Sequence, residues 1–90
     1  MKTFTITIYS DPAHAWGKVK RQVLINLGIA DKISEFSYQQ NDLVYLEEDC
    51  DLSLFIRAME QRGYKVKLDE RYVERTHIRG LPQYKYEELV

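Results

Sequence analysis

Histidine, tryptophan and three basic residues lie close together near the N-terminus: His14, Trp16, Lys18, Lys20 and Arg21. Apolar residues at helical spacing predict a helix from Ala13 or Lys18 to Leu27: Val19, Val23, Leu24 and Leu27. The free N–H groups and the dipole at a helix start bind anions, and nearby cations add affinity. Trp16 would then stack on a base. The alternative is that Trp16 closes the rim of the core and the cations form a solvated face; the chain has no phosphate-loop or dinucleotide glycine pattern.

An acidic run surrounds the single cysteine: Glu47, Glu48, Asp49, Cys50 and Asp51. Carboxylates bind magnesium or calcium and act as acid–base pairs, but the run lacks the spacing and the glycine of a calcium-binding loop. Asp49 or Asp51 is expected to cap a following helix. Cys50 with His14 or His77 would make a nucleophile and base, yet nothing in the sequence brings either histidine near it. We therefore predict no catalytic residue, no metal site and no cofactor.

The elements that would position these residues follow from hydrophobic periodicity. Alternating residues predict strands over 3–9 and 64–69, and Asn41-Asp42 predicts the turn of a hairpin over 36–47. Apolar residues at helical spacing predict a second helix over 52–62, which ends before a glycine. The resulting order is strand, helix, strand, strand, helix, strand.

This order predicts an α+β fold of the ferredoxin-like βαββαβ kind, an antiparallel sheet with two helices on one face. Residues 1–70 would form the domain, with Leu68 among its core residues. Residues 71–90 do not fit the sandwich. They form a C-terminal extension whose apolar and aromatic content is unusual for a disordered tail, so we expect it to dock on its own domain or on a partner.

The extension and the sheet offer two aromatic surfaces. The extension carries Tyr and Arg residues, the types that most often anchor interfaces: Tyr72, Arg75, Arg79, Tyr84 and Tyr86. The sheet face away from the helices would present Tyr9 and Tyr45, which suit base stacking as in RNA-recognition modules. The glycine- and aromatic-rich consensus of that module is absent from the sequence. We favour the alternative in which the extension covers this face.

Composition narrows the function classes. The formal net charge of −1 argues against a DNA mimic and against a non-specific duplex binder. The single cysteine excludes an intramolecular disulfide, and no apolar run has the length of a signal peptide core or a membrane span. We predict a cytoplasmic protein without membrane contact.

Three segments carry a resemblance to a known family: Asp11-Pro12-Ala13-His14-Ala15-Trp16, Leu27-Gly28-Ile29-Ala30-Asp31-Lys32-Ile33-Ser34 and Tyr45-Leu46-Glu47-Glu48-Asp49-Cys50-Asp51. They look like motifs shared by small uncharacterised bacteriophage and prophage proteins, over most of residues 1–70. Such relatives carry glycines beside the histidine where this chain has Ala13 and Ala15, which favours helical backbone here over a close-approach loop. The resemblance implies a setting, phage infection of a bacterium, and no activity.

Two functions fit these observations. The leading hypothesis is a phage-encoded, non-enzymatic interaction protein that binds and modulates a host protein, for instance one of bacterial defence. A homodimer through the sheet face or the extension would fit the same features. The alternative is a single-stranded nucleic-acid or nucleotide-binding module that uses the sheet face and the basic start of the first helix.

Overall fold

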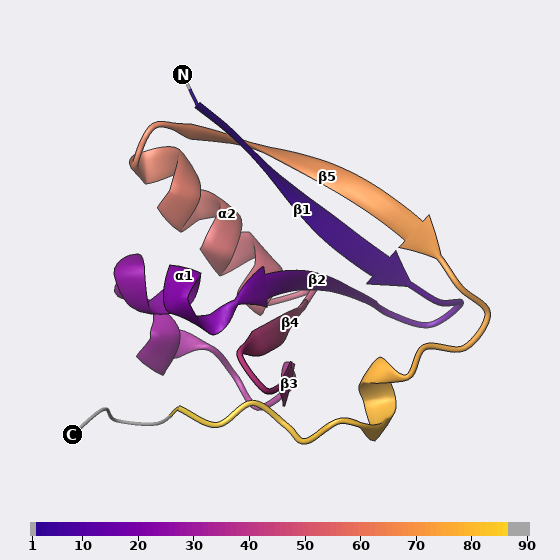
Figure 1. The fold of residues 1–90 in the computed structure, drawn as a ribbon. Helices are drawn as coiled ribbons and strands as arrows, with labels where there is room; N and C mark the ends of the chain where they lie inside the picture. The colour runs from indigo at the N-terminus through magenta and orange to yellow at the C-terminus, as the bar shows by residue number, and fades with distance from the viewer. Residues whose placement is uncertain (1, 87–90) are drawn as a thin grey trace.

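The computed structural model describes residues 2–86, whose arrangement is shown in Figure 1. The strands are β1 (Lys2–Ser10), β2 (Ala15–Lys20), β3 (Tyr38–Gln40), β4 (Leu43–Glu47) and β5 (Tyr64–Tyr72). The helices are α1 (Arg21–Asn26) and α2 (Asp51–Gln61), with 3-10 turns η1 (Ala30–Lys32) and η2 (Ile78–Gly80).

The sheet has five strands in the order β3-β4-β2-β1-β5. All neighbours are antiparallel except β1 and β5, which are parallel. The predicted α+β fold is confirmed, but the ferredoxin-like order is not, since that order has four antiparallel strands. The extra strand β2 lies between β1 and β4 and makes them parallel to each other. The connection from β4 through α2 then returns β5 parallel to β1.

The stretch that was predicted to begin the first helix forms the strand β2 instead. The helix α1 is therefore shorter than predicted and covers only Arg21–Asn26. Along β2 the side chains alternate between two clusters: Ala15 and Val19 join the core beneath the helices, whereas Trp16 joins a second cluster on the other face. The helical spacing that included Val19 was misleading, because Val19 also fits this period of two.

Asp11 closes the turn between β1 and β2. Its Oδ1 accepts hydrogen bonds from the backbone N–H groups of Ala13 and His14, both at 2.9 Å. The short-range bonds that let aspartate cap helices also stabilise turns. The same local signal therefore serves a β-hairpin here.

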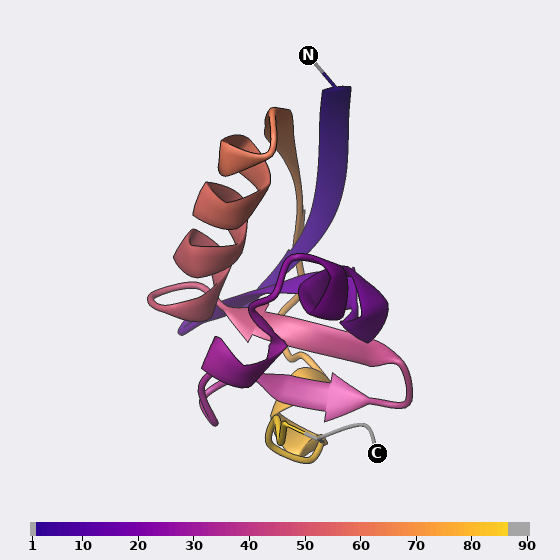
Figure 2. The same ribbon diagram turned by 90° about the vertical axis from the view of Figure 1, so that its left-hand side faces the viewer.

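Both helices cover one face of the sheet, as Figure 2 shows. Phe55 of α2 and Leu24 of α1 are fully buried against Ile6 and Leu46. Gly17 allows this close packing, because a Cβ at that position would lie 2.8 Å from Ile6 Cδ1 and 2.9 Å from Leu52 Cδ1.

The acids before α2 hold the surrounding loops. Glu47 accepts backbone N–H bonds from Asp49 and Cys50, at 3.0 and 3.1 Å. Asp51 is buried and accepts bonds from the hydroxyls of Ser34 and Ser37, at 2.6 and 2.5 Å. The expectation that Asp49 or Asp51 caps α2 is wrong, since no side chain caps that helix at its N-cap residue.

Residues 73–86, here called the tail, run across the sheet face opposite the helices and along the β3 edge, beneath β3 and β4 in Figure 1. Gln39 N–H donates to the Pro82 carbonyl at 2.9 Å, and Tyr84 N–H donates to the Ser37 carbonyl at 2.7 Å. The extension therefore docks on its own domain. Residue 1 of the predicted domain and residues 87–90 of the predicted extension lie outside the described residues.

Candidate functional site

The predicted anion site at a helix start is not formed. His14 lies in the turn before β2, and Trp16, Lys18 and Lys20 project from the sheet face opposite the helices. Arg21, the first residue of α1, donates to Gln39 Oε1 at 2.6 Å and so faces the β3 edge. Arg21 is therefore separated from the lysines, because alternation along β2 places Lys18 and Lys20 on one sheet face whereas Arg21 begins a helix.

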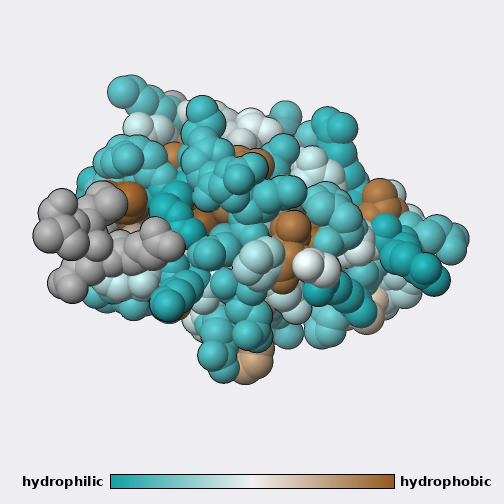
Figure 3. Space-filling view, turned by 60° about the horizontal axis from the view of Figure 1, so that its bottom comes forward, coloured by the Kyte–Doolittle hydropathy of each residue, from teal (hydrophilic) through white to brown (hydrophobic). Residues whose placement is uncertain are grey.

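The aromatic residues expected to stack bases are covered by the tail. Trp16 and Tyr45 expose only 2 % and 4 % of their surfaces and pack against Ile78 of η2. Burial raises the pKa of the Tyr45 hydroxyl above its ordinary value. Figure 3, which shows the tail side of the molecule, has a mostly hydrophilic surface with separate hydrophobic spots. Neither ring can stack on a base from the outer sheet face in this arrangement.

The residues of the extension that were predicted as interface anchors differ in their exposure and contacts. Tyr84 is buried, and its hydroxyl donates to the Ala30 carbonyl at 2.5 Å. Arg79 donates to Asp11 at 2.8 Å and lies over the Trp16 ring, 5.5 Å from its centroid. Arg79 nevertheless stays exposed, as do Arg75, Tyr86 and Tyr72, the last residue of β5.

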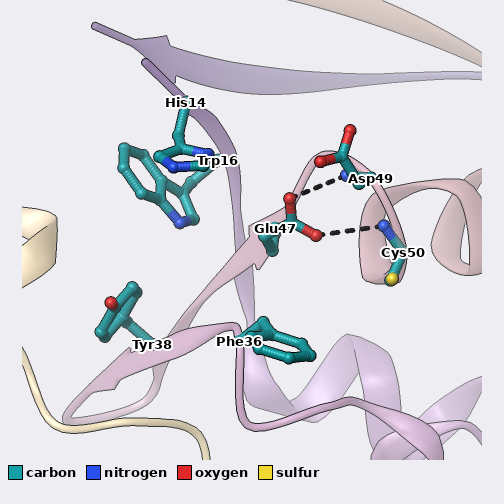
Figure 4. A pocket seen from close by; sticks show the side chains of 7 residues that line it. All are labelled: His14, Trp16, Phe36, Tyr38, Glu47, Asp49 and Cys50. Atoms are coloured by element: carbon teal, nitrogen blue, oxygen red, sulfur yellow. Dashed lines mark hydrogen bonds between the residues drawn. The ribbon is translucent and has the colours of Figure 1, made fainter.

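A hollow of about 330 Å³ opens beside the start of α2, on the side where β2 and β3 begin and β4 ends (Figure 4). Four rings line it: His14, Trp16, Phe36 and Tyr38. Its remaining wall is polar and consists of Glu47, Asp49 and Cys50. We refer to it as the aromatic pocket.

Two groups that line this pocket, Trp16 Nε1 and the Glu47 carboxylate, can each make further hydrogen bonds. Trp16 Nε1 is buried and has no acceptor among residues 2–86. In Figure 4 the indole nitrogen points into the space between Tyr38, Phe36 and Glu47. Each Glu47 oxygen accepts one backbone bond, and a carboxylate oxygen has room for two. Phe36 exposes 64 % of its surface at this pocket.

Sequence reasoning identified part of this pocket. It singled out His14 and Trp16, and it named Cys50 without finding a histidine near it; His14 and Cys50 in fact line the same hollow. No hydrogen bond joins these two side chains in the described part of the chain. The sequence does not indicate Phe36 and Tyr38 as pocket residues, because their pattern predicts only the strands of a hairpin.

A second hollow, of about 370 Å³, lies between α2 and the strands β1 and β5. Apolar side chains of Ile8, Leu52, Ile56 and Leu68 line it, with Glu48 and Glu70 at its polar part. Leu68 was expected in the core but exposes 44 % of its surface, because β5 is an edge strand. We call this hollow the β5 groove.

Comparison with protein-family models, with curated proteins and with solved structures gave no match to this chain. Within residues 2–86 there is no cluster of three or more His, Cys, Asp or Glu side chains placed to hold a metal ion. The same part of the chain contains no helix with the length and apolarity needed to cross a membrane.

Proposed function

We propose that this chain is a phage-encoded, non-enzymatic protein that acts in the host cytoplasm by binding a host protein. The binding surface is the free edge of β5 together with the β5 groove. An extended segment of the host protein adds to the sheet as a further strand. The phage setting rests on the resemblance of the sequence motifs, and the mode of binding rests on the exposed edge.

The observation that carries the proposal is the difference between the two sheet edges. The tail covers β3, where Tyr38 forms a bridge with Gln83. In the described residues β5 has β1 as its only strand neighbour. A free edge with unpaired N–H and C=O groups is a template for another strand. Charged side chains along this edge would discourage non-specific pairing.

The groove next to the edge supplies side-chain specificity. In strand addition the backbone bonds give affinity, and pockets for alternate side chains select the partner. Leu68 and Ile56 would contact an apolar side chain of the bound segment. Tyr72, which exposes 62 % of its surface, and the exposed Arg75 continue the surface beyond the groove. Both residue types are common at the energetic centre of interfaces.

One substitution tests the edge without breaking the sheet. Val73 N–H donates to the Ser10 carbonyl of β1, so every second N–H before it also faces β1. The N–H of Glu70 therefore faces the free edge. Glu70→Pro removes that donor from the edge, where proline is tolerated. Glu70→Ala keeps the donor and loses the same carboxylate, which makes it the matched control.

The experiment uses the wild-type chain to capture proteins from bacterial lysate, followed by affinity measurement with the purified partner. We expect Glu70→Pro to bind the partner about tenfold or more weakly than Glu70→Ala does, equivalent to about 1.4 kcal/mol, because both variants lose the groove carboxylate and only the proline loses the N–H donor. Equal binding by the two variants, or the absence of a saturable partner, contradicts the proposal. A homodimer through the same edge would show instead as a concentration-dependent mass in sedimentation that Glu70→Pro removes.

A second candidate is single-stranded nucleic-acid binding, favoured by lysines on the uncovered part of the outer sheet face. Lys65 and Lys67 are exposed on β5 next to Thr3 and Thr5, and Lys20 is exposed on β2. Oligonucleotide affinity should be detectable at low salt and fall steeply as salt rises. The double variant Lys20→Ala/Lys67→Ala should weaken it and reduce the salt slope, whereas Arg57→Ala on the helix side should not. No binding at low salt rejects this candidate.

A further inference from the structure

The aromatic pocket holds a buried hydrogen-bond donor without an acceptor. Trp16 exposes 2 % of its surface, and its Nε1–H finds no acceptor within residues 2–86. An unpaired buried donor costs roughly 1–3 kcal/mol, so such groups in folded proteins usually have an explanation. The indole nitrogen is turned toward the hollow (Figure 4), but the neighbouring side chains close the nitrogen itself to solvent. An occupant that moves the surrounding rings slightly apart would reach this donor and supply the acceptor.

The polar wall of the pocket offers hydrogen-bond acceptors instead of a donor. Glu47 keeps acceptor capacity beyond its two backbone bonds, and Asp49 makes no side-chain hydrogen bond in the described residues. These carboxylates favour an occupant with N–H groups. They repel phosphate, because like charges in a partly enclosed site are unfavourable. The occupant therefore presents a carbonyl to Trp16 and an N–H to Glu47, without a negative charge.

The rings define the shape of the occupant. Trp16 and Tyr38 have centroids 6.2 Å apart in an edge arrangement, and His14 lies 5.9 Å from Trp16. The exposed Phe36 ring lies at the same pocket and is free to cover a flat occupant. Aromatic walls favour a planar ring system, and the volume of about 330 Å³ falls at the small end of ligand pockets.

We propose that the aromatic pocket binds a nucleobase with a lactam edge, as the free base or nucleoside without phosphate. A lactam places a carbonyl beside a ring N–H, which matches the Trp16 donor and the Glu47 acceptor. Bases of the hypoxanthine, guanine and uracil type have this edge, and adenine lacks it. The site shares no lining residue with the β5 groove, so the proposal is independent of the partner-binding function.

The single tryptophan of the chain makes the pocket directly observable. In ¹⁵N-labelled protein one indole Nε1–H resonance belongs to Trp16. Titration with inosine should shift this resonance in the direction of a stronger hydrogen bond and should saturate. Adenosine is the matched ligand, since it differs from inosine at the lactam edge. Its affinity should be lower by about tenfold or more, because it leaves the buried donor unpaired.

Two further arms test the charge of the pocket. Inosine monophosphate should bind more weakly than inosine, and added salt should narrow the difference. Glu47→Gln should weaken inosine binding, and Glu48→Gln, which removes the same charge outside the pocket, should not. If Glu47→Gln does not fold, the comparison of inosine with adenosine on the wild-type chain still decides the question.

The result expected is a saturable Trp16 shift that ranks inosine above both adenosine and inosine monophosphate. An unmoved resonance at the solubility limit of inosine and uridine overturns the proposal. Equal affinity for inosine and adenosine overturns it as well, because the lactam would then play no part. Tighter binding of the monophosphate would likewise reject the phosphate-free class.

Discussion

The guanidinium carbon of Arg21 lies 5.0 Å from the ring centroid of Tyr84, although the two residues come from the first helix and the end of the tail. The same guanidinium donates to Gln39 Oε1 at 2.6 Å. Gln39 Oε1 also accepts the backbone N–H of Lys85 at 3.0 Å. Arg21 thus joins α1, β3 and the tail through one side chain.

Substitution of Arg21 by alanine should loosen the tail. The cation–π contact and a partly exposed charged hydrogen bond are lost together, which should lower the free energy of unfolding by about 1–2 kcal/mol. Chemical denaturation gives this value, and hydrogen exchange at the Tyr84 amide shows whether the tail opens locally.

The matched control is Arg57→Ala on the exposed side of α2, where the guanidinium makes no hydrogen bond or ion pair in the described part of the chain. Its effect should stay within about 0.5 kcal/mol. If Arg21→Ala destabilises no more than this control, Arg21 does not hold the tail.

Tyr84 should make stability fall at alkaline pH. Burial raises the pKa of its hydroxyl above the ordinary value of 10.0, and Arg21 opposes this rise. The pKa of Tyr84 is thus higher in the folded chain than in the unfolded chain. The stability that its neutral hydroxyl contributes is therefore complete below about pH 10 and is lost as the pH rises from there through the folded pKa. Tyr84→Phe should cost about 1 kcal/mol at neutral pH through the bond to Ala30.

The measurement is the free energy of unfolding between pH 7 and pH 11 for both chains. Tyr84→Phe should show a smaller alkaline loss than the wild type. Tyr45 also has a pKa raised by burial, so part of the loss should remain in the variant. Identical alkaline slopes would mean that Tyr84 ionises as easily in the folded state as in the unfolded one.

Asp51 should be among the most sensitive polar positions. It exposes 3 % of its surface and accepts bonds from the hydroxyls of Ser34 and Ser37. Asp51→Ala leaves these donors unpaired and should lower the free energy of unfolding by about 2–4 kcal/mol. The melting temperature should fall by about 10 °C or more for a domain of this size. Asp49→Ala, an exposed neighbour, should change it little.

Asp11 should contribute to acid stability. The pKa of the Asp11 carboxyl is lowered below 3.8, mainly because the carboxylate accepts the backbone N–H of His14. The positive charge of Arg79 lowers this pKa further. A lowered folded pKa gives stability that is present above the unfolded value and is lost as the pH falls through the folded one. Acid unfolding of Asp11→Asn should therefore show a smaller pH dependence below about pH 4 than the wild type. Equal dependence would contradict this role.

The hydrophobic pattern was sufficient for the parts of the fold whose period is unambiguous. Four predictions of this kind are confirmed. The strand at 3–9 is β1, and the hairpin at 36–47 is β3 with β4. The second helix is α2, and the last predicted strand is the start of β5. The stretch from Ala15 to Lys20 was misassigned, because Val19 satisfies both a helical and an alternating pattern. That one error removed a strand and with it the mixed order of the sheet.

The site could be predicted only in part for a related reason. Trp16 and Tyr45 were expected on the outer sheet face, and both are there, but their burial depends on the tail, whose path has no periodic signal. Phe36 and Tyr38 lie more than twenty residues after His14 and meet it only through the folded sheet. Contacts at such separation depend on strand order, which local spacing does not encode.

The parallel pairing of β1 with β5 has a consequence for how the chain reaches its native state. Every residue pair between these strands is separated by 62 positions along the chain, from Lys2 with Tyr64 to Ser10 with Tyr72. The chain loses the conformational entropy of closing this long loop before the strand pairing can stabilise it, which slows folding. During synthesis β1 leaves the ribosome long before β5 exists. Its apolar residues Ile6 and Ile8 then stay without that partner, so folding should be completed only after nearly the whole chain has emerged.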